Sequence, residues 1–300
     1  GMEAGTVSAP PPVGTVVNKE NATCYAGSSL QMLLTLDDFL VCLKTTIPDQ
    51  TNLPLRTCFL QTMDALAGGQ AVDPLPLLEH MLSRSPICLD AGEQNDTHQF
   101  LQQLLSMLED DYSPSNPGDS QTVAASPVKD YFGTKVREDL KCTACHWQRE
   151  RYDTWEHIMI NILPKKKANV PNGIAKALKE ETLKEVYCEM CKRTTKTTKA
   201  TTIVKLPRAL ILQLKRFKTV KRRGVMEYEK IKSRVAIAES FSWRQSILEG
   251  FLDQEAGVGL FNYDLRSVIC HVGDSADEGH YTALTRRVYP DGSWKWTEFH

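Results

Sequence analysis

The sequence predicts an α+β fold, with helices in the first third of the chain and strands in most of the remainder. Between residues 28 and 110, apolar residues recur at the short spacing of amphipathic helices. After about residue 129 the apolar runs become shorter and rich in β-branched residues, which is typical of strands. Because the two kinds of segment are separated along the chain, we expect a helical lobe and a sheet lobe with a cleft between them.

The helical patterns differ in how clearly their ends are marked. Asp96, followed by Gln99, resembles a capping box, and an apolar stripe beginning at Phe100 follows it. Gly68 and Gly69 supply a stop signal for an earlier helix. The helices expected in this part are 28–43, 55–67, 75–84 and 97–110.

The second part of the chain reads mainly as strands. A segment rich in Ser and Pro, 112–128, precedes it and is expected to be a surface loop. Within this part only 173–180 and 242–250 have a helical pattern. The expected strands are 155–163, 197–206, 209–217, 263–272 and 280–288.

Composition and charge narrow the range of partners. The chain has 300 residues, and its 36 basic and 37 acidic side chains leave a formal net charge of -1. A balance so close to neutral argues against a nucleic-acid partner. No apolar run reaches the length of a membrane span, and the first residues lack the pattern of a secretion signal. We therefore expect no membrane partner and a cytoplasmic or nuclear location.

The cysteines point to a metal site. Their number, nine, is odd, and four of them form two CxxC pairs, which is not the pattern of a disulfide framework. Thiolates at this spacing are the ligands of tetrahedral zinc. The sequence therefore predicts a closed, structural Zn²⁺ site, whose ligands would be Cys142, Cys145, Cys188 and Cys191.

A further cysteine, Cys24, lies just ahead of the first expected helix. Backbone N–H groups at a helix amino end stabilise a thiolate, and a thiolate paired with an imidazole is a nucleophile. His280, which opens an expected strand after the flexible Gly279, is the best partner in the sequence. Taken alone, this pattern is more typical of a small buried cysteine.

Together, these segments resemble the ubiquitin-specific proteases in type and in order. Cys24 lies in a segment similar to the cysteine box of the family, and His280 and Tyr281 lie in one similar to its histidine box. The two CxxC pairs resemble the zinc-bearing fingers of the family. The matching segments are NATCYAGSSLQML, QNDTHQFLQQLL, LPRALILQLKRF, YDLRSVICHVGDSADEGHYTAL and WKWTEF.

The resemblance implies a papain-like cysteine protease plan, with a helical thumb, a β-rich palm and zinc-bearing β fingers. A flexible tail, 1–13, would precede the catalytic domain, 14–300. Within that domain the thumb would cover about 14–111, and the fingers and palm about 129–300. The implied activity is hydrolysis of the peptide or isopeptide bond after the carboxy-terminal glycine of ubiquitin or a ubiquitin-like modifier, by a monomer.

The resemblance also implies roles for individual residues. Cys24 would be the nucleophile and His280 the general base and then acid. Gln94 and Asp96 match positions that face an arginine of the ubiquitin tail, which a carboxylate can pair. Tyr281 would line a narrow channel for the terminal glycines. Two segments, 218–232 and 272–279, resemble mobile loops over the cleft, or else are solvated turns.

Two departures from the family pattern bear on activity. Lys19 occupies the usual position of the oxyanion donor, so Asn18 or Asn21 would have to serve, or the donor is missing. His300, the last residue of the sequence, stands where the family places the asparagine or aspartate that orients the histidine, so either a histidine fills this role, the orienting residue is cut off at this boundary, or it is absent. The sequence therefore leaves open a weakened enzyme, a silent ubiquitin-binding scaffold of the same fold, and, from another class, a zinc-knuckle interaction module.

Overall fold

The computed structural model divides the chain into two compact units. Unit 1 contains residues 1–127 and 266–300, and unit 2 contains 128–265. The structure describes residues 13–18, 22–46, 52–86, 89, 95–112, 126–162, 168–253, 261–275, 279–289 and 291–300.

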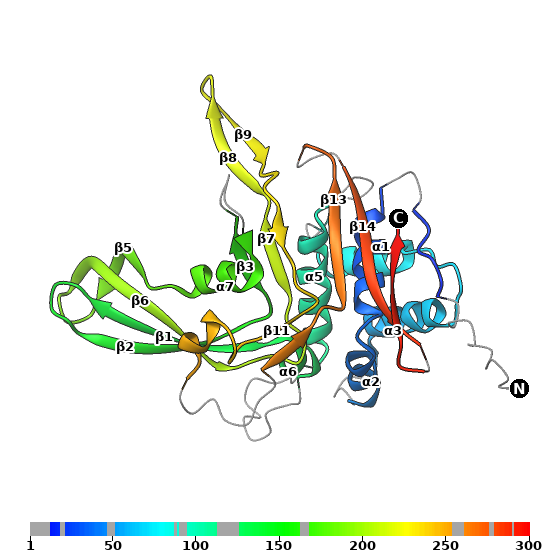
Figure 1. Ribbon diagram of the computed structural model, residues 1–300, viewed down its shortest axis with the longest axis horizontal. Coiled ribbons are helices and arrows are strands. Elements are labelled where there is room, and N and C mark those ends of the chain that lie inside the picture. Colours follow the sequence, from blue (N-terminus) through cyan, green and yellow to red (C-terminus); the bar gives the residue numbers. More distant parts are fainter. Residues whose placement is uncertain are drawn as a thin grey trace, which may run out of the picture. The chain divides into compact units, whose positions relative to one another are not determined.

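Unit 1 combines a group of helices with one antiparallel sheet, drawn in blue to cyan and in orange to red in Figure 1. Helix α1 packs against strand β14 and against helix α5. The helices are α1 (Cys24–Leu33), α2 (Asp37–Thr45), α3 (Pro54–Ala67), α4 (Leu75–Arg84) and α5 (Thr97–Asp110). The sheet has the order β13 (Ser267–Val272), β14 (His280–Val288), β15 (Trp294–Phe299).

The core of unit 1 is formed by the apolar faces of these helices. Leu30, Phe59 and Phe100 are completely buried, and the rings of Tyr25 and Phe100 meet edge to face at 5.5 Å. Each buried side chain of this size contributes roughly 1.5–3 kcal/mol relative to an exposed one. The interface between α1 and α5 is therefore a strong constraint on where α1 begins, and Cys24 is its first residue.

The prediction of one helix over 28–43 is wrong, because the chain turns between α1 and α2. Thr35 donates a side-chain hydrogen bond to the carbonyl of Met32, which competes with helical pairing of the backbone. Asp37 and Asp38 then lie in the first turn of α2, where negative charge is favourable. Among the described residues no single helix is long and apolar enough to cross a membrane; α1 and α2 reach that threshold only when counted together across their 84° bend.

Other helix predictions for unit 1 are confirmed. Helices α4 and α5 have the predicted bounds, and α3 begins one residue earlier than predicted, at Pro54. The amino end of the chain is tied to these helices through a parallel bridge between Val16 and Val72. Gly14 lies so close to the backbone of Gln70 that a side chain would not fit there.

Unit 2 is built mainly from strands. A four-stranded antiparallel sheet has the order β2-β1-β6-β5, and four smaller two-stranded pairings accompany it. Its helices are α6 (Pro127–Phe132), α7 (Val170–Leu178) and the short 3₁₀ helix η2 (Ile247–Phe251). Its strands are β1 (Thr134–Cys142), β2 (Gln148–Trp155), β3 (Ile158–Asn161), β4 (Ala168–Asn169), β5 (Glu181–Cys188), β6 (Arg193–Lys205), β7 (Leu212–Lys215), β8 (Phe217–Arg222), β9 (Val225–Lys230), β10 (Val235–Ala236), β11 (Ser240–Ser242) and β12 (Asn262–Asp264).

A ladder of alternating charge crosses the four-stranded sheet. Glu138 on β1 is nearly fully buried and lies directly opposite Arg151 on β2, with Oε2 2.7 Å from the guanidinium Nη2. Lys199 on β6 lies 3.4 Å from the other carboxylate oxygen and 2.8 Å from Glu181 on β5. Because each charge has an opposite neighbour on the next strand, the ladder favours this register over its alternatives.

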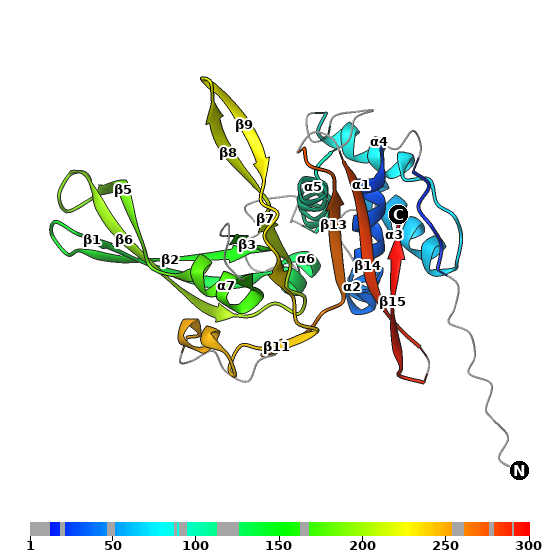
Figure 2. The same ribbon diagram turned by 45° about the horizontal axis from the view of Figure 1, so that its top comes forward.

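Several predictions for the second part of the chain are wrong in detail. Of 242–250 only the end becomes helical, as η2, because Trp243 is instead fully buried in the core of unit 2. The segment 218–232, for which a mobile loop or a solvated turn was expected, lies largely in the hairpin β8–β9, shown in yellow in Figure 2. Its turn residues, Arg223 and Gly224, both have positive φ, the conformation of a tight type I′ turn. Most of the predicted loop 112–128 lies outside the described residues, as does part of 272–279.

Candidate active site

Cys24 lies at the amino end of α1 in unit 1. Only 4% of the residue is exposed. The carbonyl of Thr23 accepts hydrogen bonds from the N–H groups of Ala26 and Gly27, so the helix is closed immediately around the cysteine. Because α1 starts at this residue, the positive end of the helix lies next to the sulfur.

The start of β14 reaches the same sulfur. The backbone N–H of Tyr281 donates to Cys24 Sγ across 3.5 Å. Tyr281 directly follows His280, the first residue of the strand. The structure therefore brings the predicted nucleophile to the strand end that carries the predicted base, although the two residues lie far apart in the sequence.

Asn18 is held by Thr23, the residue directly before Cys24. The backbone N–H of Thr23 donates to Asn18 Oδ1 at 3.0 Å, and the Thr23 hydroxyl lies 3.4 Å from the same oxygen. Since a backbone N–H can only donate, the carbonyl end of the Asn18 amide is fixed toward Thr23. The other end, an NH₂ group, is the part that could serve an oxyanion. Asn21 and Lys19 lie outside the described residues.

His300 lies beside His280 but does not orient it through a hydrogen bond. The two rings are parallel, with an interplanar angle of 6°, and their centroids are 6.4 Å apart. At that separation the ring nitrogens are too far apart for a hydrogen bond. His300 instead has Nε2 3.9 Å from a carboxylate oxygen of Glu298, which is a contact between exposed side chains.

Asp96 and Tyr281 are joined directly. The Tyr281 hydroxyl donates to Asp96 Oδ2 at 3.1 Å, and Asp96 Oδ1 accepts the N–H of Gln99 at 2.9 Å. The second bond confirms the predicted side-chain cap of α5. Burial and the Asp96 carboxylate raise the pKa of Tyr281, so the phenol remains a donor throughout the neutral range. Gln94 lies outside the described residues.

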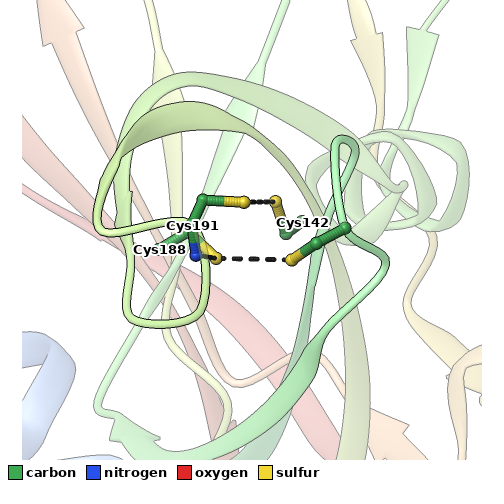
Figure 3. A group of neighbouring side chains, drawn as sticks. Cys142, Cys188 and Cys191 are labelled. Carbon is green, nitrogen blue, oxygen red and sulfur yellow. Dashed lines mark hydrogen bonds between the residues drawn. The ribbon is translucent and has the colours of Figure 1, made fainter.

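The four paired cysteines form a separate cluster in unit 2. Two hairpins carry it: Cys142 ends β1 before the turn to β2, and Cys188 ends β5 before the turn to β6. The residue after the second cysteine of each pair, His146 or Lys192, has positive φ, so the two turns have the same local form. All four sulfur atoms lie within 4.8 Å of one another. Figure 3 shows how the sulfurs meet between the two turns.

The geometry and protonation of this cluster fit a metal site. The sulfurs of Cys142 and Cys191 are 3.9 Å apart, and those of Cys145 and Cys188 are 3.6 Å apart. A tetrahedral ion with bonds of about 2.3 Å to sulfur requires separations of about 3.8 Å. Hydrogen bonding, first from Thr195, lowers the pKa of Cys142 to about 6, whereas the neighbouring thiols, first Cys145, raise the pKa of Cys191. The cluster could therefore hold a metal ion through four sulfurs.

Two neighbours of these sites were not predicted from the sequence. Thr23 holds Asn18, and its only signal was its position directly before Cys24. Thr195 lies on β6, with its hydroxyl 3.3 Å from Cys142 Sγ, and nothing in its spacing distinguished it from the other threonines of that strand. Both contacts depend on how the backbone folds.

Comparison with solved structures supports the fold. The SAGA Ubp8/Sgf11/Sus1/Sgf73 DUB module bound to ubiquitin aldehyde matches with a TM-score of 0.71 and 19% identity, over 100% of this chain and 68% of that one. A structure of the module bound to monoubiquitin matches with a TM-score of 0.72 and 20% identity, over 98% and 66% of the two chains. The predicted fold class is confirmed.

Sequence comparison identifies the family. Ubiquitin carboxyl-terminal hydrolase 36 of Drosophila melanogaster is 26% identical over 91% of this chain and 26% of its own length. Hydrolase 48 of Rattus norvegicus is 26% identical over 91% and 26%, and hydrolase 17 of Homo sapiens is 24% identical over 95% and 51%. The chain thus spans a quarter to a half of the length of these relatives. The family model described as "Ubiquitin carboxyl-terminal hydrolase" matches residues 16–300. The chain therefore belongs to the ubiquitin carboxyl-terminal hydrolase family, as its resemblance to the ubiquitin-specific proteases predicted.

Proposed function

We propose that this protein is a cysteine-type deubiquitinase, which hydrolyses the peptide or isopeptide bond after the carboxy-terminal glycine of ubiquitin or a ubiquitin-like modifier. The observation that carries the proposal is the 3.5 Å contact between the Tyr281 N–H and Cys24 Sγ. It assembles a helix amino end, a thiol and a histidine-bearing strand at one place in unit 1. Membership of the family supports the same reaction.

The reaction follows from the positions of these groups. The Cys24 thiolate attacks the carbonyl carbon of the terminal glycine, and the electron pair of the C=O bond moves to its oxygen. The NH₂ group of Asn18 donates to that oxyanion. When the C–N bond breaks, His280 gives a proton to the leaving amine, and a thioester remains on Cys24. Water, deprotonated by His280, then adds to the thioester and releases the thiolate and the free carboxylate.

The substrate tail would be held by side chains close to this centre. We assign Asp96, with Gln94, to the arginine of the ubiquitin tail, because a carboxylate is the strongest partner for a guanidinium. Tyr281 would line the channel that admits only glycine. The solved structures of similar fold contain ubiquitin or its aldehyde, which supports the choice of modifier.

His300 favours a second candidate, a silent ubiquitin-binding scaffold. In a fully oriented triad the third residue accepts a hydrogen bond from the histidine. The parallel rings of His280 and His300 do not provide this bond. A thiolate and an imidazolium attract each other without a third residue, so we expect a slow enzyme, with His300 as a neighbour that only packs against the base.

We assign the four-sulfur cluster of unit 2 to structural Zn²⁺. Four thiolates are the donor set that zinc prefers, and the sulfur separations match its bond length. When bound, the ion would join two hairpins and leave no coordination position for water, so it takes no part in hydrolysis. A reducing compartment, cytoplasm or nucleus, suits a chain whose four clustered cysteines offer reduced sulfurs to a metal ion.

Covalent capture tests the proposal. Ubiquitin with an electrophile at its carboxy terminus should form an adduct with the wild-type protein, and peptide mass spectrometry should place it on Cys24. Cys24→Ala should form no adduct, whereas Cys42→Ala, which removes a half-buried thiol from α2 of the same unit, should react like wild type. Binding of ubiquitin without an adduct would favour the silent scaffold, and absence of both would contradict the proposal.

A further inference from the structure

The side chain of Tyr281 connects three elements of unit 1. Its hydroxyl donates to Asp96 Oδ2, at the residue directly before the start of α5. Its ring lies against the His271 ring of β13, with centroids 4.9 Å apart. Its own backbone N–H donates to Cys24 Sγ. One residue therefore links the start of α5, strand β13 and the sulfur at the start of α1.

The position of Tyr281 at a strand end makes these links important. His280 and Tyr281 are the first two residues of β14, paired with Val272 and His271 of β13. Strand ends open most readily, because their outer hydrogen bonds are the first to be lost. Gly279, just before the strand, lies so close to the His271 ring that an added Cβ would be 2.1 Å from Nε2. The hydrogen bond to α5 therefore acts at a strand end that opens readily and that packs closely against His271.

Asp96 is already engaged within the protein. It is an exposed residue, yet one carboxylate oxygen caps α5 through Gln99 and the other accepts the phenol of Tyr281. A carboxylate used only to capture a substrate arginine would not need either bond. The two bonds together fix the helix start relative to the strand start.

We propose that Asp96 is a positioning residue, which holds the start of β14 against Cys24 through the hydroxyl of Tyr281. This inference rests on the proposed function, because it assigns a purpose to the geometry around the nucleophile. The Asp96–Tyr281 hydrogen bond keeps the Tyr281 N–H within reach of Sγ and keeps His280 at the same strand end. Loss of the bond leaves the fold intact and loosens the thiol's surroundings.

Two substitutions isolate the bond from the other roles of these residues. Asp96→Ser keeps a good helix cap, since serine is among the preferred capping residues, but its side chain is too short to reach the phenol. Tyr281→Phe keeps the ring and the backbone N–H and removes only the hydroxyl. Tyr112→Phe is the matched control, because it removes another buried phenol of unit 1, one that donates to the carbonyl of Leu43 and accepts from Arg56.

The readout is alkylation of Cys24 by iodoacetamide, followed by peptide mass spectrometry, because this small reagent needs no ubiquitin site. At pH 7, both Asp96→Ser and Tyr281→Phe should react about fivefold to tenfold more slowly than wild type, since a thiolate loses a well-placed donor. Asp96→Ser/Tyr281→Phe should be no slower than either single variant, and Tyr112→Phe should match wild type.

Hydrolysis of a ubiquitin amide provides the second readout. Positioning predicts that both single variants lower kcat by a similar factor. If Asp96→Ser raises only KM and leaves alkylation at the wild-type rate, Asp96 is solely a substrate-binding residue and the inference is overturned. The inference would also be overturned if the two single variants lowered kcat by unequal factors and the double variant lowered it by the product of those factors.

The two proposals fail in different ways. If wild type forms no ubiquitin adduct, the proposed function fails, but the alkylation rates of wild type and the four variants still report whether the bond positions Cys24. If wild type forms the adduct and Tyr281→Phe is alkylated at the wild-type rate, the function stands and the positioning role is rejected.

Discussion

The molecule places cysteine in two settings that lead to different chemistry. Cys24 is buried at the amino end of α1, with one backbone N–H from β14 directed at its sulfur. Cys145 and Cys191, in contrast, lie in hairpin turns of unit 2, each with a sulfur from the other hairpin within 4 Å. The neighbours of the Cys24 sulfur are a helix end and a strand end, whereas the nearest neighbours of the other sulfurs are mainly further sulfurs.

The comparison shows that neighbours decide what a thiol does. An isolated sulfur beside a helix end and an N–H is stabilised as an anion and stays available for attack. Four sulfurs that share a small volume repel as anions, unless a cation lies between them. We therefore propose the same side chain as a nucleophile in unit 1 and as a metal ligand in unit 2.

The largest expected effect is the loss of Cys24. Cys24→Ala should lower hydrolysis of a ubiquitin amide by roughly 10⁴-fold or more, because no other group replaces the attacking thiolate. The melting temperature should change little, since alanine keeps a small apolar side chain in the same pocket. If Cys24→Ala kept a tenth of the wild-type rate, Cys24 would not be the nucleophile, and the contrast with the metal-binding cysteines would fail.

The carboxamide of Asn18 should rank next. Asn18→Ala removes the group that Thr23 holds beside the cysteine, and we expect kcat to fall by about 10²- to 10³-fold with KM nearly unchanged. Capture by an electrophile that forms no oxyanion should be almost unaffected. If both reactions fall equally, Asn18 supports the loop instead of the oxyanion.

Disruption of the cluster should affect stability before activity. Cys188→Ser should lower the melting temperature by about 10 °C and release the metal, because a closed zinc site contributes directly to folding. Chelation of the wild-type protein should have the same effect, measured by scanning fluorimetry together with elemental analysis. If chelation left the melting curve of the wild-type protein unchanged and elemental analysis found no zinc, the four-sulfur cluster would not be a structural metal site.

The charge ladder beside the cluster should contribute less. Glu138→Ala leaves Arg151 and Lys199 without the carboxylate they share, and we expect it to lower the free energy of unfolding by about 2 kcal/mol. Urea denaturation measures this change. Arg149→Ala, which removes an arginine of the same strand whose contact with Glu189 is long and exposed, is the control and should have almost no effect.

The smallest effect concerns the pH dependence of unit 2. Burial lowers the pKa of His157, between β2 and β3, so the unfolded chain binds this proton more readily than the folded one. Stability should fall as the pH drops below about 6.5, the ordinary histidine value. Metal sites also lose ions in acid. His157→Asn should make the decline shallower in metal-free protein, and an unchanged slope would assign the decline to other groups.

The sequence predicts elements whose signal is local. Helices α4 and α5 are confirmed at their predicted bounds, because apolar spacing and, for α5, the Asp96 cap mark them. The break between α1 and α2 was missed, since a hydrogen bond from Thr35 and packing outweigh a nearly continuous apolar pattern. The hairpin β8–β9 was missed because its charged residues resemble a loop, although its Arg-Gly turn was a usable signal.

From the sequence, only those residues of the candidate site that lie in recognisable motifs could be predicted. Resemblance to a family selected Cys24, Asp96 and Tyr281, and the structure brings these residues together. Their catalytic and binding roles stay predictions. The stacking of His280 on His300 was not readable, because it depends on the register that pairs Ala283 with Phe299 across β14 and β15.

The two turns that carry the cluster lie at the ends of hairpins whose inner strands, β1 and β6, pair with each other. A slip of two residues between these strands would keep every side chain on its proper face, yet would displace Cys142 by about 7 Å relative to Cys191. That displacement exceeds the 4.8 Å within which all four sulfurs now lie. Only the correctly aligned sheet would bring the four sulfurs close enough to bind the ion. Binding of the ion would therefore stabilise the correct alignment of β1 and β6 over a slipped one.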